Sequence, residues 1–292
     1  TLNVDPGTID PTADLGALGQ ALDAAGVDFL GVAASGSVGL SFEQADALAT
    51  AGLAFVPAAD VTLSVDAAQV AQIAADPSDA AAFGVDHLAS GTATITDTEA
   101  SSLVGAGLDF VDSDTVTVEA EGRQLNTTLK GMQDLNVDSI SVRVAGVGSL
   151  AVDAGAGLGD LSATGLPSFV IDQTDAELNV TVNFDGGALD PTADLGGLVG
   201  ALDQAGVDHI GTVGSVDLSL SLAQASDIAS TGVDFVSLID VTVNLADAEI
   251  GAAAAAAFDL AAINVDHLSV TDGTVTISDF EASQIVDAGL DF

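Results

Sequence analysis

The sequence has no cysteine, no tryptophan and no tyrosine, and only three of its 292 residues are lysine or arginine. The lack of cysteine excludes a disulfide framework, thiolate metal sites and thiol nucleophiles. With 44 acidic side chains the net charge is −41, so the chain repels phosphate backbones and anionic lipid surfaces, where binding depends on Lys and Arg. We therefore expect no nucleic acid among its partners.

Long apolar runs are also missing. The longest stretch without a formal charge is the 14 residues between Asp28 and Glu43, whereas a spanning helix needs about 20 apolar residues. We therefore expect no membrane insertion. Apolar residues nevertheless make up 48% of the chain, which is enough to bury a core and argues against disorder.

A long internal repeat organises the chain. The segment IDPTADLG at 9–16 recurs as LDPTADLG at 189–196, an offset of 180 that becomes 182 after an insertion near Thr271 and Asp272. Residues 1–112 and 181–292 are thus two copies of one segment. We interpret residues 113–180 as the rest of the first superrepeat, and the whole chain as one continuous array.

A shorter signature recurs ten times: Gly or Asn, then Val or Leu, usually Asp, and often Phe or His. It starts at residues 26, 52, 84, 107, 136, 165, 206, 232, 264 and 289. These spacings of 23 to 41 residues are typical of a solenoid unit, which buries its faces against its neighbours. About six units make one superrepeat.

Each unit is predicted to contain two strands and a helix. The first signature position follows Ala- and Leu-rich runs, where a helix ends in a left-handed residue that Gly and Asn adopt easily. Helix starts are predicted at Ser41, Asp97 and Asp279, each two residues before a Glu. Runs such as VTLSV at 61–65 alternate apolar and polar residues, which predicts strands.

The expected fold class follows from the spacing of strands compared with that of helices. Two strands paired as a hairpin advance about 9.6 Å per unit, which matches helices packed about 8–10 Å apart. We therefore expect an α/β repeat solenoid with two layers, in which helices cover one face of a long mixed sheet. The alternative is a three-sided α/β coil, with the two strands of each unit in separate sheets.

The two ends of the sequence lie inside repeats. Residues 1–4 align with the later part of the strand at 179–184, and Phe292 aligns with Phe110. Natural solenoids carry polar caps, which neither end has. We therefore expect a slice of a longer array, or ends that further copies or other subunits cover.

The Asp of the signature forms a predicted ladder along one edge. Each carboxylate is expected to accept backbone N–H groups just after a helix. The alternative is that calcium relieves the repulsion of the column, because it binds carboxylate oxygens, although no formal calcium motif is present. The residues concerned are Asp28, Asp86, Asp109, Asp138, Asp208, Asp234, Asp266 and Asp291.

The three histidines, His87, His209 and His267, occupy the position that Phe fills in other signatures, including Phe29 and Phe55. This equivalence predicts packing at the start of a strand, since metal ligation requires histidines that converge. The alternative is a row of rings on the open sheet face, which would form an adhesive interface.

All three basic residues fall in one part of the superrepeat. Arg123 and Lys130 are seven residues apart on a predicted helix and therefore on one face, and Arg143 follows. They pair locally with acidic neighbours or, alternatively, form a positive patch that docks on the acidic flank of another copy.

No catalytic pattern is present. The sequence has no nucleophile elbow, no phosphate-binding glycine motif and no His beside a plausible nucleophile. We expect that the protein is not an enzyme.

The excess of Asp over Glu (37 to 7), the lack of Cys and the richness in Ala, Gly, Val and Thr are compositional features of the whole chain. In these it resembles the giant repetitive surface proteins and adhesins of Gram-negative bacteria, many exported by type I secretion, without their calcium-binding nonapeptide arrays. The resemblance implies a structural extracellular repeat protein that forms a fibre, surface layer or adhesin stalk by stacking and self-association.

Two other functions remain open. One is an ice- or mineral-binding module that uses a flat Thr and Ser sheet face, as in TATIT at 92–96. In the other, the acidity is an adaptation of an ordinary scaffold to high salt.

Overall fold

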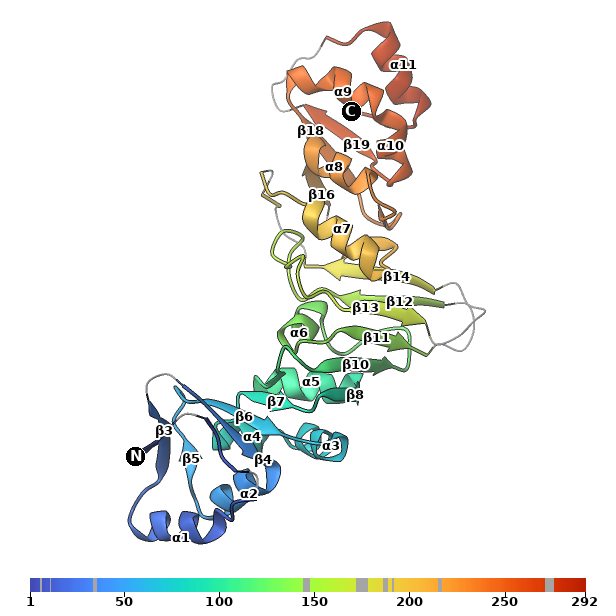
Figure 1. Ribbon diagram of the computed structural model, residues 1–292. Coiled ribbons are helices and arrows are strands. Elements are labelled where there is room, and N and C mark those ends of the chain that lie inside the picture. The colour runs from blue at the N-terminus through green and yellow to red at the C-terminus, as the bar shows by residue number, and fades with distance from the viewer. Residues whose placement is uncertain are drawn as a thin grey trace. The chain divides into compact units, whose positions relative to one another are not determined.

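The protein is described by a computed structural model covering residues 1–5, 7–10, 12–33, 36–143, 148–171, 178–185, 189–190, 192–214, 217–270 and 276–292. It is a mixed α/β protein with several parallel sheets (Figure 1). Contacts divide it into two compact units: Thr1–Ala120 with Gly131–Ile140, and Glu121–Lys130 with Ser141–Phe292. All three boundaries between them, after residues 120, 130 and 140, fall inside the segment 113–180 that connects the two sequence copies.

Eleven short α-helices are present in the described part of the chain, and none is long and apolar enough to cross a membrane. They are α1 (Gly16–Ala24), α2 (Phe42–Thr50), α3 (Ala67–Ala75), α4 (Ser78–Phe83), α5 (Asp97–Ala106), α6 (Leu129–Asp134), α7 (Gly196–Ala205), α8 (Leu222–Ala229), α9 (Ile250–Ala255), α10 (Ala257–Ala262) and α11 (Asp279–Asp287).

Helix ends follow local sequence rules. Ser41 caps α2, as predicted, and its hydroxyl accepts the Gln44 backbone N–H while the Gln44 side chain accepts the Ser41 N–H. For α5 and α11 the predicted caps were wrong by one residue, because Thr96 and Ser278 cap these helices. The Glu three residues after each of them closes the same reciprocal box, which places the cap earlier.

The strands are short. They are β1 (Leu2–Val4), β2 (Gly7–Thr8), β3 (Phe29–Val32), β4 (Ser37–Ser41), β5 (Ala54–Phe55), β6 (Asp60–Ser64), β7 (His87–Ala89), β8 (Thr92–Thr96), β9 (Asp109–Phe110), β10 (Thr115–Ala120), β11 (Ser139–Val142), β12 (Gly148–Asp153), β13 (Ser168–Ile171), β14 (Leu178–Phe184), β15 (His209–Thr212), β16 (Leu218–Ser221), β17 (Asp234–Phe235), β18 (Val241–Leu245) and β19 (His267–Val270).

The expected long mixed sheet was wrong. The strand pairs of the described residues are parallel and belong to five separate sheets. The two strands of one unit, such as β7 and β8, lie in different sheets, as the alternative predicted. Parallel strands need a crossover between them, and the helix of each unit supplies it.

Strand order repeats from sheet to sheet. We call a strand that begins at the signature a signature strand, and the one after it a second strand. Two second strands are followed by two signature strands in the orders β4-β6-β7-β9 and β12-β14-β15-β17, and β16-β18-β19 follows the same order. The first of these sheets has one more short strand, β2, beside β4. This common order makes two successive units, rather than one, the structural period.

Signatures therefore alternate between two kinds. We call those starting at 26, 84, 136, 206 and 264 odd signatures, and those starting at 52, 107, 165, 232 and 289 even signatures. In the even ones Phe55, Phe110 and Phe235 are buried, and Phe55 packs edge-on against Phe83 with ring centroids 5.4 Å apart. In the odd ones the fourth residue lies on the partly exposed sheet face.

Candidate functional site

Each histidine lies in a row of three residues across neighbouring strands. In β6, β7 and β9, Thr62 is opposite His87, which is opposite Asp109. The same order of Thr, His and Asp recurs twice in the second of the two compact units. We call these rows the Thr–His–Asp rungs; the other two are Thr181, His209, Asp234 and Thr242, His267, Asp291.

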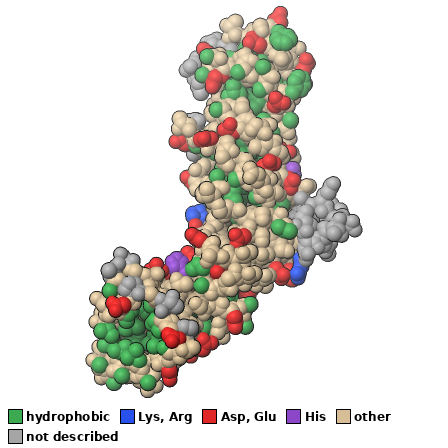
Figure 2. Space-filling model, viewed as in Figure 1, with side chains coloured by type: hydrophobic (Ala, Val, Ile, Leu, Met, Phe, Trp, Pro, Cys, Tyr) green, Lys and Arg blue, Asp and Glu red, His purple; other side chains and the backbone are tan. Residues whose placement is uncertain are grey.

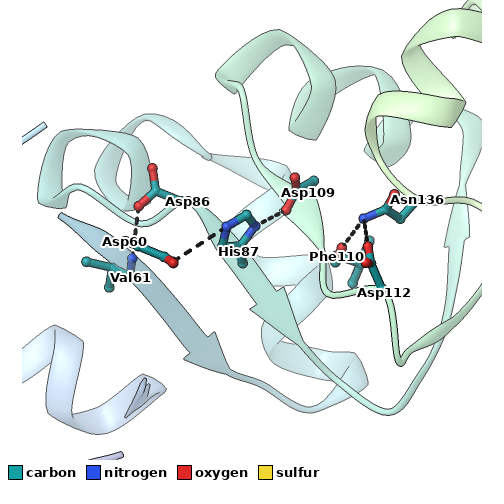
Figure 3. Close-up of polar contacts among 8 residues, drawn as sticks. All are labelled: Asp60, Val61, Asp86, His87, Asp109, Phe110, Asp112 and Asn136. Atoms are coloured by element: carbon teal, nitrogen blue, oxygen red, sulfur yellow. Dashed lines mark hydrogen bonds and ion pairs between the residues drawn. The ribbon is translucent and has the colours of Figure 1, made fainter. Parts of the chain in front are cut away.

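The His of each rung is bonded to its Asp. The Nδ1 atom of His87 contacts an Asp109 carboxylate oxygen, and its Nε2 atom lies 3.6 Å from Asp60, at the start of β6 (Figure 3). The ring is thus placed between two carboxylates on different strands.

The other two histidines are arranged in a similar way. His267 Nδ1 contacts Asp291, and its Nε2 atom lies 3.4 Å from Asp240. His209 Nδ1 lies 2.5 Å from Asp234. The triplets around His87 and His267 occupy equivalent positions of the two sequence copies.

The carboxylates favour the charged imidazole. Partial burial has the largest effect on the pKa of His87 and lowers it, but the hydrogen bond and charge of Asp109, with the charges of Asp60 and Asp86, raise the pKa above its ordinary value overall. For His267 the hydrogen bond with Asp291 is the largest cause, and the pKa is raised. Each of these two rings is therefore protonated more readily than an ordinary histidine, and in the protonated form it bridges two acidic groups.

Such a bridge differs from a hydrolytic triad. A triad also has an Asp bonded to His Nδ1, but its Nε2 atom faces a nucleophilic hydroxyl. Here Nε2 of His87 and of His267 faces a second carboxylate, Asp60 or Asp240. The arrangement stabilises a cation and joins strands, rather than drawing a proton from Thr62 or Thr242.

The two sequence copies show that His and Asp occur together. At the position of the His209–Asp234 pair, the first copy has Phe29 opposite Ala54. Both members of the pair change at once, from two hydrogen-bonded polar residues to two apolar ones. This is consistent with His and Asp acting as a pair.

The remaining signature aspartates bond to backbone. Asp86 accepts the N–H of Val61 at 2.9 Å, and its own N–H donates to the Val61 carbonyl at 3.0 Å (Figure 3). The odd signatures at 84, 136, 206 and 264 share this double contact with the preceding second strand. The other pairs are Asp138 with Val116, Asp208 with Val180 and Asp266 with Val241.

The aspartates of the predicted ladder therefore make two different kinds of contact. Odd signatures direct Asp to a backbone amide, whereas the even-signature residues Asp109, Asp234 and Asp291 direct it to a histidine. Asp28 accepts a bond from the Ala54 N–H through its backbone carbonyl. Over the described residues no three acidic or His side chains converge as a metal site, and calcium binding stays a prediction.

The rings of the signature face two different environments, so the expected equivalence of His and Phe was too simple. Phe55 is buried, whereas Phe29 is 47% exposed and lies in the odd register of His87, His209 and His267. The partly exposed set is Phe29 with the three histidines. An adhesive role for this row stays a prediction.

The basic residues do not share one helix. Helix α6 includes Lys130 but begins at Leu129, so Arg123 lies outside it, in the segment before it. Arg143 directly follows β11. All three are exposed, and docking on another copy stays a prediction.

Sequence reasoning predicted Asn136 and Asn264 as left-handed helix ends but missed the bonds that their side chains make. Asn136 and Asn264 end helices in the left-handed conformation, and their side-chain amides donate to the carbonyls of Phe110 at 2.6 Å and Phe235 at 2.5 Å. These bonds join one unit to the next. The occurrence of Asn in place of Gly was the available signal.

Comparison with protein-family models, with characterised proteins and with solved structures finds no match to this chain.

Proposed function

We propose that the chain is a structural, extracellular repeat protein without catalytic activity. Its units stack as a solenoid, and the resulting array builds a fibre, surface layer or adhesin stalk by self-association. The recurrence of the same inter-unit contacts in both sequence copies carries this proposal.

Two sets of contacts recur. Asp60, His87 and Asp109 correspond to Asp240, His267 and Asp291, and both triplets connect successive units. The Gln of the capping box recurs in the same way. Gln44 donates to the Asp10 carbonyl at 2.7 Å, and Gln224 donates to the Asp190 carbonyl at 2.8 Å. Because the same contacts recur in both sequence copies, they support a structural role in a repeating array.

The charge of the surface also supports a structural role. Acidic side chains are scattered over the visible face, with few basic ones among them (Figure 2). High net charge of one sign keeps a long array soluble. Because aromatic rings and basic groups are scarce, strong binding of sugars or anions is not favoured.

Electron microscopy tests the proposal. The purified chain is imaged by negative stain across a range of protein and salt concentrations, with sedimentation velocity in parallel. We expect elongated assemblies that lengthen with protein concentration. Single particles of one size under all conditions would contradict self-association. Labelling of intact source cells with an antibody against the chain tests the extracellular location, and staining only after permeabilisation would contradict it.

The surface-binding alternative has one supporting observation. Thr94 is opposite Thr117, whose hydroxyl lies 3.0 Å from that of Ser139, so three hydroxyl groups form a row. The corresponding rows elsewhere contain histidine. A thermal hysteresis assay tests ice binding, and no hysteresis would exclude it.

A further inference from the structure

A cavity of about 630 Å³ lies among helices α2, α3 and α4 of the first compact unit. Its floor consists of buried apolar side chains: Leu53, Leu63, Ile73, Phe83 and Val85. All of its lining residues are described by the structure and belong to this one unit. Small-molecule sites typically enclose about 300–1,000 Å³ and are mostly apolar, so the cavity has the size and floor of such a site.

Three carboxylates line the same cavity, each from a different helix or helix end. Asp46 lies on α2, Asp76 directly follows α3, and Asp79 lies in the first turn of α4; all three are exposed. Among the described residues that line the cavity, none is Lys, Arg or His. An apolar floor is therefore combined with a rim of negative charge. We call this cavity, with its three carboxylates, the α2–α4 cavity.

The second sequence copy shows the equivalent helices in a closed arrangement. Helix α10, the counterpart of α4, packs against α8, the counterpart of α2. Ala80, which is partly exposed and lines the α2–α4 cavity, has Leu260 as its counterpart. Leu260 is fully buried. A larger apolar side chain at this one position therefore fills the space between the two helices of the second copy.

A proline also distinguishes the first copy. Asp76 precedes Pro77, and the residue before a proline disfavours the helical conformation. Its backbone has φ −146° and ψ 79°, which separates α3 from α4. The counterpart of Asp76 is Ala256, with φ −94° and ψ 3°, and α10 begins at the residue after it. The first copy thus gives α4 a different course from that of α10.

The carboxylates change together with the cavity. Asp46 has Ser226 as its counterpart, and Asp76 has Ala256. Packing does not require these changes, because Asp46 and Asp76 are exposed and exposed acidic side chains are tolerated on either arrangement of helices. The copy with the open cavity is therefore also the copy that surrounds it with carboxylates. This combination fits a ligand that is both apolar and positively charged.

We propose that the α2–α4 cavity binds a small organic cation with an apolar body, such as a hydrophobic alkylammonium ion. The apolar part lies on the floor beside Phe83, and the ammonium group lies between the carboxylates of Asp46, Asp76 and Asp79. The net charge of −41 raises the concentration of cations around the chain and so favours their capture. The site is independent of the proposed self-association and adds a binding activity to the structural role.

Hexylammonium is the probe, and isothermal titration calorimetry in about 0.15 M salt measures its binding, since salt screens the general attraction to an acidic chain. Methylammonium has the charge without the apolar chain, and hexanol has the chain without the charge. We expect hexylammonium to bind at a single site, and each of the two controls to bind at least about tenfold more weakly. From butyl- to pentyl- to hexylammonium, each further buried methylene should strengthen binding about fourfold.

Substitutions copied from the second sequence copy locate the site. Ala80→Leu fills the cavity as Leu260 fills its counterpart, and it should abolish saturable binding of hexylammonium. Asp46→Ser combined with Asp76→Ala changes only exposed residues and should weaken binding by about two- to thirtyfold. Urea unfolding followed by far-UV circular dichroism shows whether each variant is folded. If Ala80→Leu is not, the exposed pair of substitutions still tests the site.

A matched pair of substitutions separates the site from general attraction to the chain. Asp79→Asn removes a carboxylate at the cavity, while Asp259→Asn removes its exposed counterpart beside the closed helices. Asp79→Asn should weaken hexylammonium binding by about two- to fivefold, and Asp259→Asn should leave it unchanged. Equal effects of these two substitutions, or unchanged binding in a folded Ala80→Leu variant, would overturn the site.

The amide chemical shifts of the isotopically labelled chain report where the probe binds. Titration with hexylammonium should shift the signals of α2, α3 and α4 and leave those of α8, α9 and α10 in place. Equal shifts in both sequence copies, or no saturable binding of hexylammonium to wild type, would overturn the proposal. None of these outcomes depends on assembly of the chain, so the cavity and the proposed self-association are tested separately.

Discussion

The His–Asp bridges predict that the protein loses stability as the pH rises. The pKa values of His87 and His267 are raised in the folded chain, so their contribution is fully present below the unfolded pKa near 6.5. It is lost as the pH rises through the folded pKa. In this range the folded state binds more protons than the unfolded state, and the free energy of unfolding therefore falls with pH.

The composition makes this range easy to interpret. Between about pH 6 and about pH 9 only histidine, cysteine and the terminal amine titrate, and this chain has three histidines and no cysteine. The His87 side chain is 37% exposed, so solvent screens its pairs, and we expect about 0.2–1 kcal/mol from this bridge. The loss should be smaller in 1 M salt.

Urea unfolding followed by far-UV circular dichroism provides the assay, because the chain has no Trp or Tyr for fluorescence. The variant His87→Phe with Asp109→Ala copies the natural pair Phe29–Ala54. Its unfolding midpoint should depend less on pH than that of wild type. A midpoint that rises from pH 6 to pH 9 in wild type, or an unchanged pH dependence in the variant, would refute the bridge.

Two further predictions concern the backbone. Asn136→Ala should destabilise by about 2 kcal/mol, through the lost bond to the Phe110 carbonyl and the left-handed backbone. Gly107→Ala is the control, because its backbone has φ 73° and there is open space around the added carbon. It should lower the free energy of unfolding only through the left-handed backbone, by about 1 kcal/mol. Equal losses in the two variants would show that the bond from the Asn136 amide contributes nothing. Gly211→Ala should lower the urea midpoint because its new carbon collides with the Asn183 side chain, and adding Asn183→Ala should restore part of the loss.

Local structure was largely predictable from the sequence. Nine of the ten signatures begin with Gly or Asn in the left-handed conformation, and Gly232 is the exception. A helix end depends on the few residues around it, so a short motif is enough to locate it. The wrong caps at Asp97 and Asp279 show the limit, since two adjacent residues could each cap and the Glu three positions later decides.

Strand pairing was not predictable in the same way. Alternation of apolar and polar residues in VTLSV at 61–65 predicts which side chains face the core, but not which strand lies next to β6. The hairpin interpretation relied on matching the spacing of helices and strands. Parallel pairing satisfies the same spacing, because β4 and β6 of successive units lie side by side with a helix between them in sequence.

The two-unit period explains why the signature keeps Asp at a position where stacking brings like charges together. A column of carboxylates on adjacent strands would repel itself. In odd signatures, residues such as Asp86 bond to a backbone N–H, and in even signatures residues such as Asp109 bond to an imidazole. Apart from Asp28, each of these carboxylates thus contacts a backbone N–H or an imidazole of a neighbouring strand, and these contacts join successive units. At Phe29 and Ala54 two apolar residues take the place of the His–Asp pair instead.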